Sequence, residues 1–330
     1  MNEPAQEPAP RGRLRRVLGS IWLRIAVTIA LLAIVAAQID WATMERRLSN
    51  GHPEDFAAAV ALLVVALGIG AWRWHLLLRA AGIALAVPRL LRVYAVSTFS
   101  NTFLPTTVGG DVARALLVAR RGKPLTRAAV TVLVDRIAGL VGLVGLAWLA
   151  FALDAGSVPA GAQSLLAIVT VALAASTILA AAALRGAGAL RRLVPARLGA
   201  MARESWSLVQ GYARSPLLML AIVLSSIVFQ ALVALQLVML ASAIDVELPF
   251  ATAAVALALV TLATLLPVSI GGFGVREGTY VVLLGGASIA ATNATLISVL
   301  TVAALFFASL PGAYLLARGG LAPALETTSP

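Results

Sequence analysis

The sequence of 330 residues has no cysteine, only two histidines and few charged residues, which make up 12% of the chain. Without cysteine there is no disulfide, thiolate metal site or cysteine nucleophile, and two scattered histidines leave little for a zinc centre. A soluble domain has about 25% charged residues. The low share of charge therefore excludes an ordinary soluble enzyme and a disordered chain.

Hydrophobic residues are abundant instead, at 61% of the chain, and the mean hydropathy is +0.97. They form several apolar runs of about 20 residues, the length that spans a bilayer as a helix. The net charge of +11 would suggest nucleic acid in a soluble protein, but here the arginines lie in short loops between apolar runs. The charge therefore indicates membrane topology, and no nucleic-acid partner is expected.

The N-terminal tail, residues 1–20, ends in four closely spaced arginines before an apolar run over residues 21–39. A cleaved signal peptide is the alternative interpretation. The run is long enough to span, however, and Gln38, Asp40 and Trp41 resemble a membrane interface more than a small-residue cleavage site. Because basic clusters stay in the cytoplasm, we expect a cytoplasmic N-terminus and a multi-pass protein of the cytoplasmic (inner) membrane.

The remaining apolar runs predict one transmembrane domain over residues 21–318, followed by a tail at 319–330. Between its spans lies a basic loop at residues 185–214, with apolar positions near one helical face. We expect an amphipathic helix lying on the cytoplasmic membrane surface; a solvated basic loop near anionic headgroups is the alternative. The six expected spans are residues 21–39, 56–78, 126–151, 164–184, 217–240 and 295–317.

Two further apolar stretches, near residues 88–118 and 249–291, are interrupted by proline and paired glycines. Basic residues flank the first stretch on both sides, so both of its ends are expected in the cytoplasm. A re-entrant hairpin explains both the broken helix and the basic residues at its two ends. Irregular backbone at membrane depth is tolerated only where protein or a water-filled cavity surrounds it. The predicted fold class is an all-α polytopic membrane protein with about six to eight transmembrane helices.

The two broken stretches repeat each other at a constant offset of 162 positions. Leu104-Pro105, Gly109-Gly110 and Arg114 recur as Leu266-Pro267, Gly271-Gly272 and Arg276. The flanking spans agree at the same offset and cross the membrane in opposite senses, which predicts an inverted repeat with oppositely oriented hairpins. Chance matches in a chain rich in alanine, leucine and glycine are the alternative. Inverted repeats are typical of transporters whose site lies near the membrane midplane.

The candidate binding residues are the polar, charged and helix-breaking positions of these motifs and of the third span. Arg114 and Arg276 would attract a phosphate at opposite mouths of one pathway, although Arg114 also fits a topology anchor. Asp111 lies three residues before Arg114, so it forms a local ion pair or serves as a gate or proton site. The candidates are Asn101, Pro105, Gly109, Gly110, Asp111, Arg114, Asp135, Arg136, Pro267, Gly271, Gly272, Gly274, Arg276 and Glu277.

Asp135 and Arg136 lie inside the third span, where insertion of a charge costs about 2.5–3.5 kcal/mol. Neighbours on a helix point about 100° apart, so each needs a partner from another segment. Asp135 is expected to pair with Arg114 or Arg276, either within the site or as a structural bridge. Asn101 is expected to satisfy backbone groups that the helix break exposes, rather than to contact a ligand.

No catalytic constellation is visible in the sequence. It has no paired histidines, nucleophile elbow or phosphate-cradling loop, so the protein is expected not to be an enzyme, not to use ATP and to need no cofactor or metal. Any transport would use an external gradient or run downhill.

Three segments carry a family resemblance: Asn101 to Arg114, Asp135 to Leu140 and Leu266 to Glu277. They resemble the transmembrane region of lysylphosphatidylglycerol synthases, which is called flippase-like. The resemblance implies a bacterial or archaeal membrane protein whose motif residues are the candidates given above. In the bifunctional relatives this region is assigned to moving an aminoacylated lipid to the outer leaflet. The sequence lacks their aminoacyl-transferase domain after its last span, so synthesis of the lysyl-lipid is not expected.

The function expected from these observations is translocation of an anionic or aminoacylated phospholipid, or another lipid-linked headgroup, between leaflets of the inner membrane. The partners would be membrane lipids, bound by the phosphate of the headgroup, and the sequence leaves room for a lipid-modifying enzyme or an oligomer. An ion-coupled carrier of small solutes and a non-transporting scaffold for lipid-modifying enzymes are the alternatives.

Overall fold

The computed structural model describes residues 21–37, 39–103, 109–119, 125–186, 196–266 and 268–318. Within these ranges the chain forms twelve α-helices and one short 3-10 helix, and it contains no strand. This confirms the predicted all-α class. The expected tails at 1–20 and 319–330 lie outside the described residues, as do the two motif prolines, Pro105 and Pro267.

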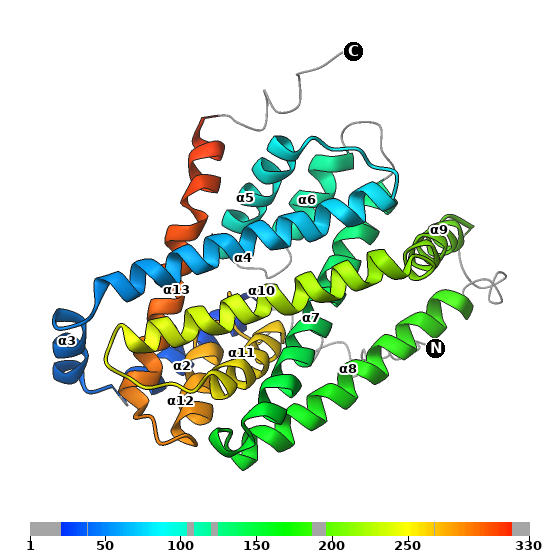
Figure 1. Ribbon diagram of the computed structural model, residues 1–330. Helices are drawn as coiled ribbons and strands as arrows, with labels where there is room; N and C mark the ends of the chain where they lie inside the picture. The colour runs from blue at the N-terminus through cyan, green and yellow to red at the C-terminus, as the bar shows by residue number, and fades with distance from the viewer. Residues whose placement is uncertain are drawn as a thin grey trace, which may run out of the picture.

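The helices follow one another with short connections (Figure 1). Their bounds are α2 Ile21–Ala36, α3 Trp41–Ser49, α4 Pro53–Ala80, α5 Val87–Phe103, α6 Gly109–Ala119, α7 Leu125–Leu153, η1 Ala155–Ser157, α8 Ala160–Gly186, α9 Ala196–Ala213, α10 Pro216–Ser242, α11 Phe250–Leu265, α12 Val275–Gly285 and α13 Ala291–Ala317.

Five of these helices, α4, α7, α8, α10 and α13, are long and apolar enough to cross a membrane. They coincide with five of the six expected spans. The sixth expected span contains α2, which has 16 residues and is followed by α3 after a bend of 80°. The part of the chain that the structure describes therefore holds five or six spans, as expected of a multi-pass membrane protein.

Eight of the helices after α3 form two copies of one four-helix pattern, and α8 and α9 lie between the copies. Each copy has a long helix, two short helices and a second long helix. The first copy is α4 to α7, and the second is α10 to α13. Corresponding helices have nearly equal lengths: 28 and 27 residues, 17 and 16, 11 and 11, and 29 and 27. The repeat predicted from a few motif residues thus extends to the order and length of whole helices.

The two copies run in opposite directions and interlock. The helices α4 and α10 pack along one another, and the N–H of His52, just before α4, donates to the C=O of Ala243, just after α10, at 2.9 Å. The short helix α5 packs against α13 of the other copy, and its counterpart α11 packs against α7. The first short helix of each copy therefore lies against the last long helix of the other, and the second short helix lies against the last long helix of its own copy.

The short helices of each copy fold back on each other as a helical hairpin. In the first copy the side-chain oxygen of Asn101 accepts from the N–H of Gly110 at 2.8 Å, and the Ser97 hydroxyl donates to the C=O of Gly110 at 2.8 Å. In the second, a Cβ on Gly272 would lie 2.9 Å from Cγ2 of Thr264. Both breaks thus return the chain beside the helix that it has left. Whether the hairpins re-enter the membrane from opposite sides stays a prediction.

The two hairpins are packed differently. In α11 every residue from Ala251 to Val260 is buried, so this helix forms the centre of the main apolar core. In α5 only some positions are buried, and its polar residues after Tyr94 face a cavity described below. Among the described residues, α5 therefore borders a cavity with its polar side chains, whereas most of α11 is enclosed by apolar side chains.

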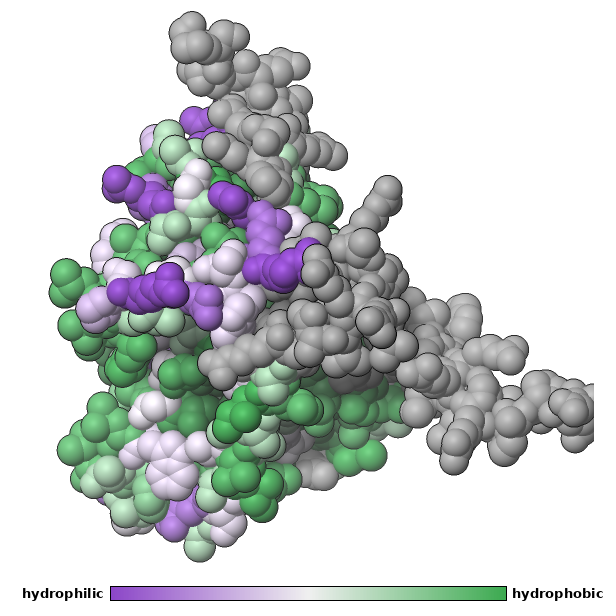
Figure 2. All heavy atoms as spheres, turned by 90° about the vertical axis from the view of Figure 1, so that its right-hand side faces the viewer, coloured by the Kyte–Doolittle hydropathy of each residue, from purple (hydrophilic) through white to green (hydrophobic). Residues whose placement is uncertain are grey.

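The outer surface is apolar over long stretches. On α8 the side chains of Ile168, Val171 and Leu179 are exposed, and on α10 those of Leu217 and Leu224 are exposed. Figure 2 shows one face on which hydrophilic side chains gather in the upper part and hydrophobic ones dominate the lower part. Large contiguous apolar surface is typical of contact with lipid.

The basic loop contains the helix α9, which packs against α7, α8 and α10. The Tyr212 hydroxyl donates to the C=O of Leu77 at 3.2 Å, and Arg127 Nε donates to Glu204 Oε1 at 3.0 Å. A helix therefore occupies the C-terminal part of the expected 185–214 segment, and residues 187–195 lie outside the described ranges. Its place on the membrane surface stays a prediction.

Candidate functional site

Five charged side chains from three helices of the first copy form one connected network of ion pairs. Asp135 on α7 is its centre. Its Oδ1 accepts from Arg73 Nε on α4 at 2.8 Å, and its Oδ2 accepts from Arg114 Nη1 on α6 at 3.2 Å. One carboxylate thus joins α4, α6 and α7.

Asp111 extends the network on the side of α6. Its Oδ1 accepts from Arg114 Nη2, one turn along the same helix, at 2.8 Å, and its Oδ2 accepts from Arg136 Nε at 2.6 Å. Asp135 and Arg136 are neighbours in sequence, yet they point to different partners, as their positions on a helix require. The predicted pairs of Arg114 with Asp111 and with Asp135 are confirmed.

Four of the five charges are buried. The exposed fractions are 5% for Arg73, 7% for Asp111, 4% for Arg114 and 3% for Asp135. The fifth, Arg136, keeps 45% of its side chain exposed. Buried ions persist only where they are paired and hydrogen-bonded, and here each of the four carboxylate oxygens accepts from a guanidinium group.

Aromatic rings and a hydroxyl hold the two buried guanidinium groups in place. Arg114 lies over the ring of Trp74 at 4.9 Å and over that of Tyr94 at 5.4 Å. Arg73 lies 5.7 Å from the ring centre of Phe229, and its Nη1 donates to the Ser226 hydroxyl at 3.0 Å. A desolvated cation over an aromatic face gains about 2 kcal/mol or more, so the rings stabilise both guanidinium groups in their buried positions.

The network lines a cavity of about 680 Å³ that both copies of the repeat enclose. Most of the lining is apolar, and the other polar groups come mainly from α5, namely Ser97, Thr98, Asn101 and Thr102. The second copy contributes Phe229 and Gln230 of α10, Thr261 and Leu265 of α11 and Leu305 of α13. The residues from α10 and α13 come from the central turns of these helices. That the site lies near the membrane midplane stays a prediction.

The edge of the cavity reaches the outer surface. Val112 of α6, Leu133 of α7 and Leu265 of α11 line the cavity and are also exposed, at 52%, 57% and 42%. Arg136 lines the cavity and is exposed beside them. The cavity therefore combines buried charges at its interior with apolar side chains and one arginine at its edge.

The second motif forms a separate ion pair. Arg276 Nη2 donates to Glu277 Oε1 at 3.0 Å, and the same oxygen accepts from the Ser298 hydroxyl at 3.1 Å. The N–H of Gly274, which has a φ of +82°, donates to Glu277 Oε2 at 2.6 Å. These residues hold the start of α12 and are not among the residues that line the charged cavity.

The structure thus brings together part of the predicted set. Asn101, Asp111, Arg114, Asp135 and Arg136 line the cavity. The glycines of the first motif, Gly109 and Gly110, begin α6, and Gly271, Gly272 and Gly274 adopt positive φ angles in the turn before α12. The expectation that Arg114 and Arg276 flank one pathway stays a prediction.

Arg73 is a charged member of the network that is not among the candidates predicted from the sequence. Together with His75 and Arg79 it has the pattern typical of the cytoplasmic end of a span, but its side chain is buried in the ion-pair network. The signal available in the sequence is its place between Trp72 and Trp74, inside the expected span at residues 56–78, where an arginine that only anchors the span end would lie deeper in the membrane than necessary.

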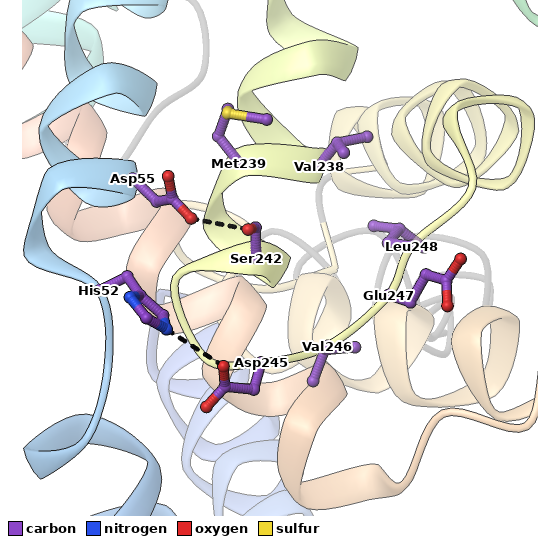
Figure 3. A pocket seen from close by; sticks show the side chains of 9 residues that line it. All are labelled: His52, Asp55, Val238, Met239, Ser242, Asp245, Val246, Glu247 and Leu248. Atoms are coloured by element: carbon purple, nitrogen blue, oxygen red, sulfur yellow. Dashed lines mark hydrogen bonds and ion pairs between the residues drawn. The ribbon is translucent and has the colours of Figure 1, made fainter.

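A second cavity, of about 660 Å³, lies where α4 begins and α10 ends (Figure 3). His52 Nε2 lies 3.2 Å from Asp245 Oδ1, and the Ser242 hydroxyl donates to Asp55 Oδ2 at 2.6 Å. His52 Nδ1 is also 3.1 Å from Glu54 Oε1, and these contacts raise the pKa of His52, that with Glu54 most. The cluster ties the two copies together at this end.

Comparison with protein families gives a match over most of the chain. The family described as lysylphosphatidylglycerol synthase TM region matches residues 21–312. The matched range includes the first repeat copy, the second copy up to residue 312 of α13, and all of the cavity residues. No curated protein shows a significant match to the chain.

Proposed function

Because the chain belongs to the family of lysylphosphatidylglycerol synthase TM regions, we propose that it moves a lipid with a phosphate-bearing headgroup between membrane leaflets. The membrane would be the cytoplasmic membrane of a bacterium or archaeon, with the N-terminus in the cytoplasm. The movement would need no nucleotide hydrolysis and no covalent chemistry, so the protein would be a transporter rather than an enzyme.

The observation that carries this proposal is the composition of the cavity from its interior to its edge. Buried arginines lie inside, and exposed apolar side chains from α6, α7 and α11 lie at the rim. A phosphate forms strong charge-assisted hydrogen bonds with guanidinium groups, whereas acyl chains need an apolar path to the surrounding lipid. A cavity with both properties suits an amphiphile better than a freely soluble solute.

The repeat supports a way of moving the headgroup. In transporters built from inverted repeats, alternating access is largely a rocking of one repeat against the other around a fixed binding site. The cavity lies between the copies, and each hairpin packs against the last helix of the other copy. A small rocking of one copy against the other would therefore change which side of the cavity is open while the headgroup stays at the ion-pair network.

Reconstitution into vesicles tests the proposal. The purified protein would be placed in vesicles with a fluorescent phosphatidylglycerol, and quenching of the outer leaflet would show how fast the inner label becomes accessible. We expect faster exchange than in protein-free vesicles. Arg136→Gln, which removes the accessible cation at the rim, should slow exchange by about tenfold, because one lost charge contact of about 1.4 kcal/mol changes a rate or affinity by that factor.

The matched control is Arg127→Gln, which also removes an arginine ion pair from α7, but at the exposed contact with Glu204. It should leave exchange within about twofold of the wild type. No exchange above the protein-free rate in the wild type, with every tested lipid, would refute the proposal. Uptake of a soluble solute by the same vesicles would instead favour an ion-coupled carrier, and neither activity would favour a scaffold.

A further inference from the structure

The start of α4 and the end of α10 belong to different repeat copies, and several contacts join them. Arg47 Nη1 on α3 donates to the C=O of Ile244 at 2.7 Å, and the N–H of His52 donates to the C=O of Ala243 at 2.9 Å. The two segments are so close that a Cβ on Gly51 would lie 2.6 Å from the carbonyl oxygen of Ala243. These contacts do not depend on pH, and they fix the position of the side chains at this junction.

One side chain at the junction has a charge that depends on pH. The ring of His52 lies between two carboxylates: its Nε2 is 3.2 Å from Asp245 Oδ1, and its Nδ1 is 3.1 Å from Glu54 Oε1. Figure 3 shows the ring pointing across the junction at Asp245. Because Asp245 follows α10, this contact joins the two copies, whereas the contact with Glu54 stays at the start of α4.

Both ring contacts are favourable only when the imidazole is charged. An ionised carboxylate only accepts hydrogen bonds, whereas a neutral imidazole has one donor nitrogen and one acceptor nitrogen. A neutral His52 would therefore turn a lone pair toward one of the two carboxylates. The imidazolium donates from both nitrogens, and its hydrogen bonds with Glu54 and Asp245, in that order, raise the pKa of His52 above the ordinary value of 6.5.

Within the described part of the chain, four carboxylates and one arginine lie around this junction. Two of the carboxylates come from α4 of the first copy, and two follow α10 of the second copy. Carboxylates that face each other across an interface repel, so a positive charge on His52 favours the joined arrangement of the copies. These charged groups are Arg47 on α3, Glu54 and Asp55 on α4, and Asp245 and Glu247 after α10.

From these contacts we propose that a proton on His52 holds the two repeat copies together at this end of the protein, so that acid on this side slows the movement of lipid. The last step rests on the proposed function, because that function needs one copy to rock against the other. In the expected topology this end faces the outside of the cell. The ring contacts are exposed, so the proton adjusts an attachment that the other contacts maintain at every pH.

A distance measurement that does not depend on transport tests the first step. Ala57→Cys on α4 and Phe250→Cys on α11, both at exposed positions, would carry spin labels in a chain that has no other cysteine. Pulsed electron paramagnetic resonance would give the distances between the two labels. We expect the share of longer distances to be about two- to fivefold larger at pH 8.5 than at pH 5.5, the range for exposed charge contacts.

Three variants separate the proton on His52 from other effects of pH. His52→Gln and Asp245→Asn should each remove most of the pH response of the label distances. His75→Gln replaces the other histidine of the chain and is the matched control, because histidine is the side chain whose ordinary pKa lies between the two pH values. It should keep the response. Distances that do not change with pH in the wild type, or that still change in His52→Gln, would overturn the proposal.

Lipid exchange in the vesicles described above tests the second step. The wild type should exchange lipid about two- to fivefold more slowly at pH 5.5 than at pH 8.5, whereas His52→Gln should exchange it equally fast at both. Equal rates in the wild type, together with distances that depend on pH, would refute control of lipid movement by His52. No exchange at either pH would refute the proposed transport function, while the label distances would still decide whether His52 holds the copies together.

Discussion

Arg73 Nε donates to Asp135 Oδ1 at 2.8 Å, although 62 positions separate the two residues in the chain. This ion pair joins the first and last long helices of the first repeat copy, α4 and α7. Both side chains are almost completely buried. The contact therefore fixes how these two helices are placed around the cavity, and the hairpin between them is attached to it through Arg114.

We expect Arg73→Met to destabilise the protein by about 3–5 kcal/mol, because removing one partner leaves the other charge buried without full compensation. Methionine keeps the length of the side chain and its apolar stem. Thermal unfolding in detergent would measure the change, with the fraction of protein that stays in solution after heating as the signal. Arg79→Met at the end of the same helix is the control and should change stability little.

A double variant separates a charge effect from a packing effect. If the loss in Arg73→Met comes from the unpaired Asp135, then Arg73→Met combined with Asp135→Asn should be more stable than the sum of the two single variants predicts. Strict additivity of the two changes would contradict a direct energetic link between Arg73 and Asp135.

Local spacing was sufficient to predict one part of the network. Asp111 and Arg114 lie three positions apart on a helix, so the pair follows from helix geometry, and the breaks at paired glycines followed from backbone chemistry. The repeat followed from motif residues at a constant offset. These features depend on the sequence nearby, or on a comparison of the sequence with itself.

The remaining contacts depend on how distant helices are placed, which local patterns do not contain. Arg73 meets Asp135 only because α4 packs beside α7, and in sequence an arginine near the end of an apolar run resembles a topology marker. Arg276 and Arg114 occupy equivalent motif positions, but only Arg114 lines the charged cavity. Equal motifs thus acquire different surroundings, because α11 is buried while α5 borders the cavity.

The approach of α7 to α10 depends on a glycine. A Cβ on Gly142 would lie 2.5 Å from Cβ of Ser226 and 2.7 Å from its carbonyl carbon. Gly142→Ala should therefore separate these helices and destabilise the protein by about 1–3 kcal/mol, the range for overpacking. Thermal unfolding would measure the difference.

Gly145, one turn further along α7, is the matched control for this prediction. A Cβ there meets nothing within 4 Å, so Gly145→Ala should leave stability unchanged or raise it by up to about 1 kcal/mol through the better helix propensity of alanine. Equal destabilisation by both substitutions would contradict close helix contact at Gly142.

The contacts of His52 predict a pH dependence of stability. Its hydrogen bonds with Glu54 and Asp245, in that order, raise the pKa of His52 above its ordinary value of 6.5. A raised pKa in the folded state means that the stabilisation is fully present below about pH 6.5 and is lost as the pH rises through the raised value. The stability of the wild type should therefore exceed that of His52→Gln by a larger margin at pH 5.5 than at pH 8.5.

The midpoint of thermal unfolding at the two pH values would measure this difference. Comparison of the two proteins at each pH cancels the contributions of the groups that they share. A gain that is equal at both pH values, or larger at pH 8.5, would contradict the role of the charged imidazole between Glu54 and Asp245.

The absence of cysteine in the sequence allows a direct test of the two hairpins. Single cysteines at Ala84 and Leu125 flank the first hairpin, and those at Glu247 and Ser288 flank the second; all four positions are exposed. If each hairpin enters and leaves on one side of the membrane, a membrane-impermeant thiol reagent applied to intact cells should label both members of a pair equally.

Because the copies are inverted, the reagent should label Glu247→Cys and Ser288→Cys but not Ala84→Cys and Leu125→Cys until the membrane is permeabilised. Labelling of Ala84→Cys without Leu125→Cys, or of Glu247→Cys without Ser288→Cys, would instead show that the short helices of that pair cross the membrane, and would refute the re-entrant arrangement there.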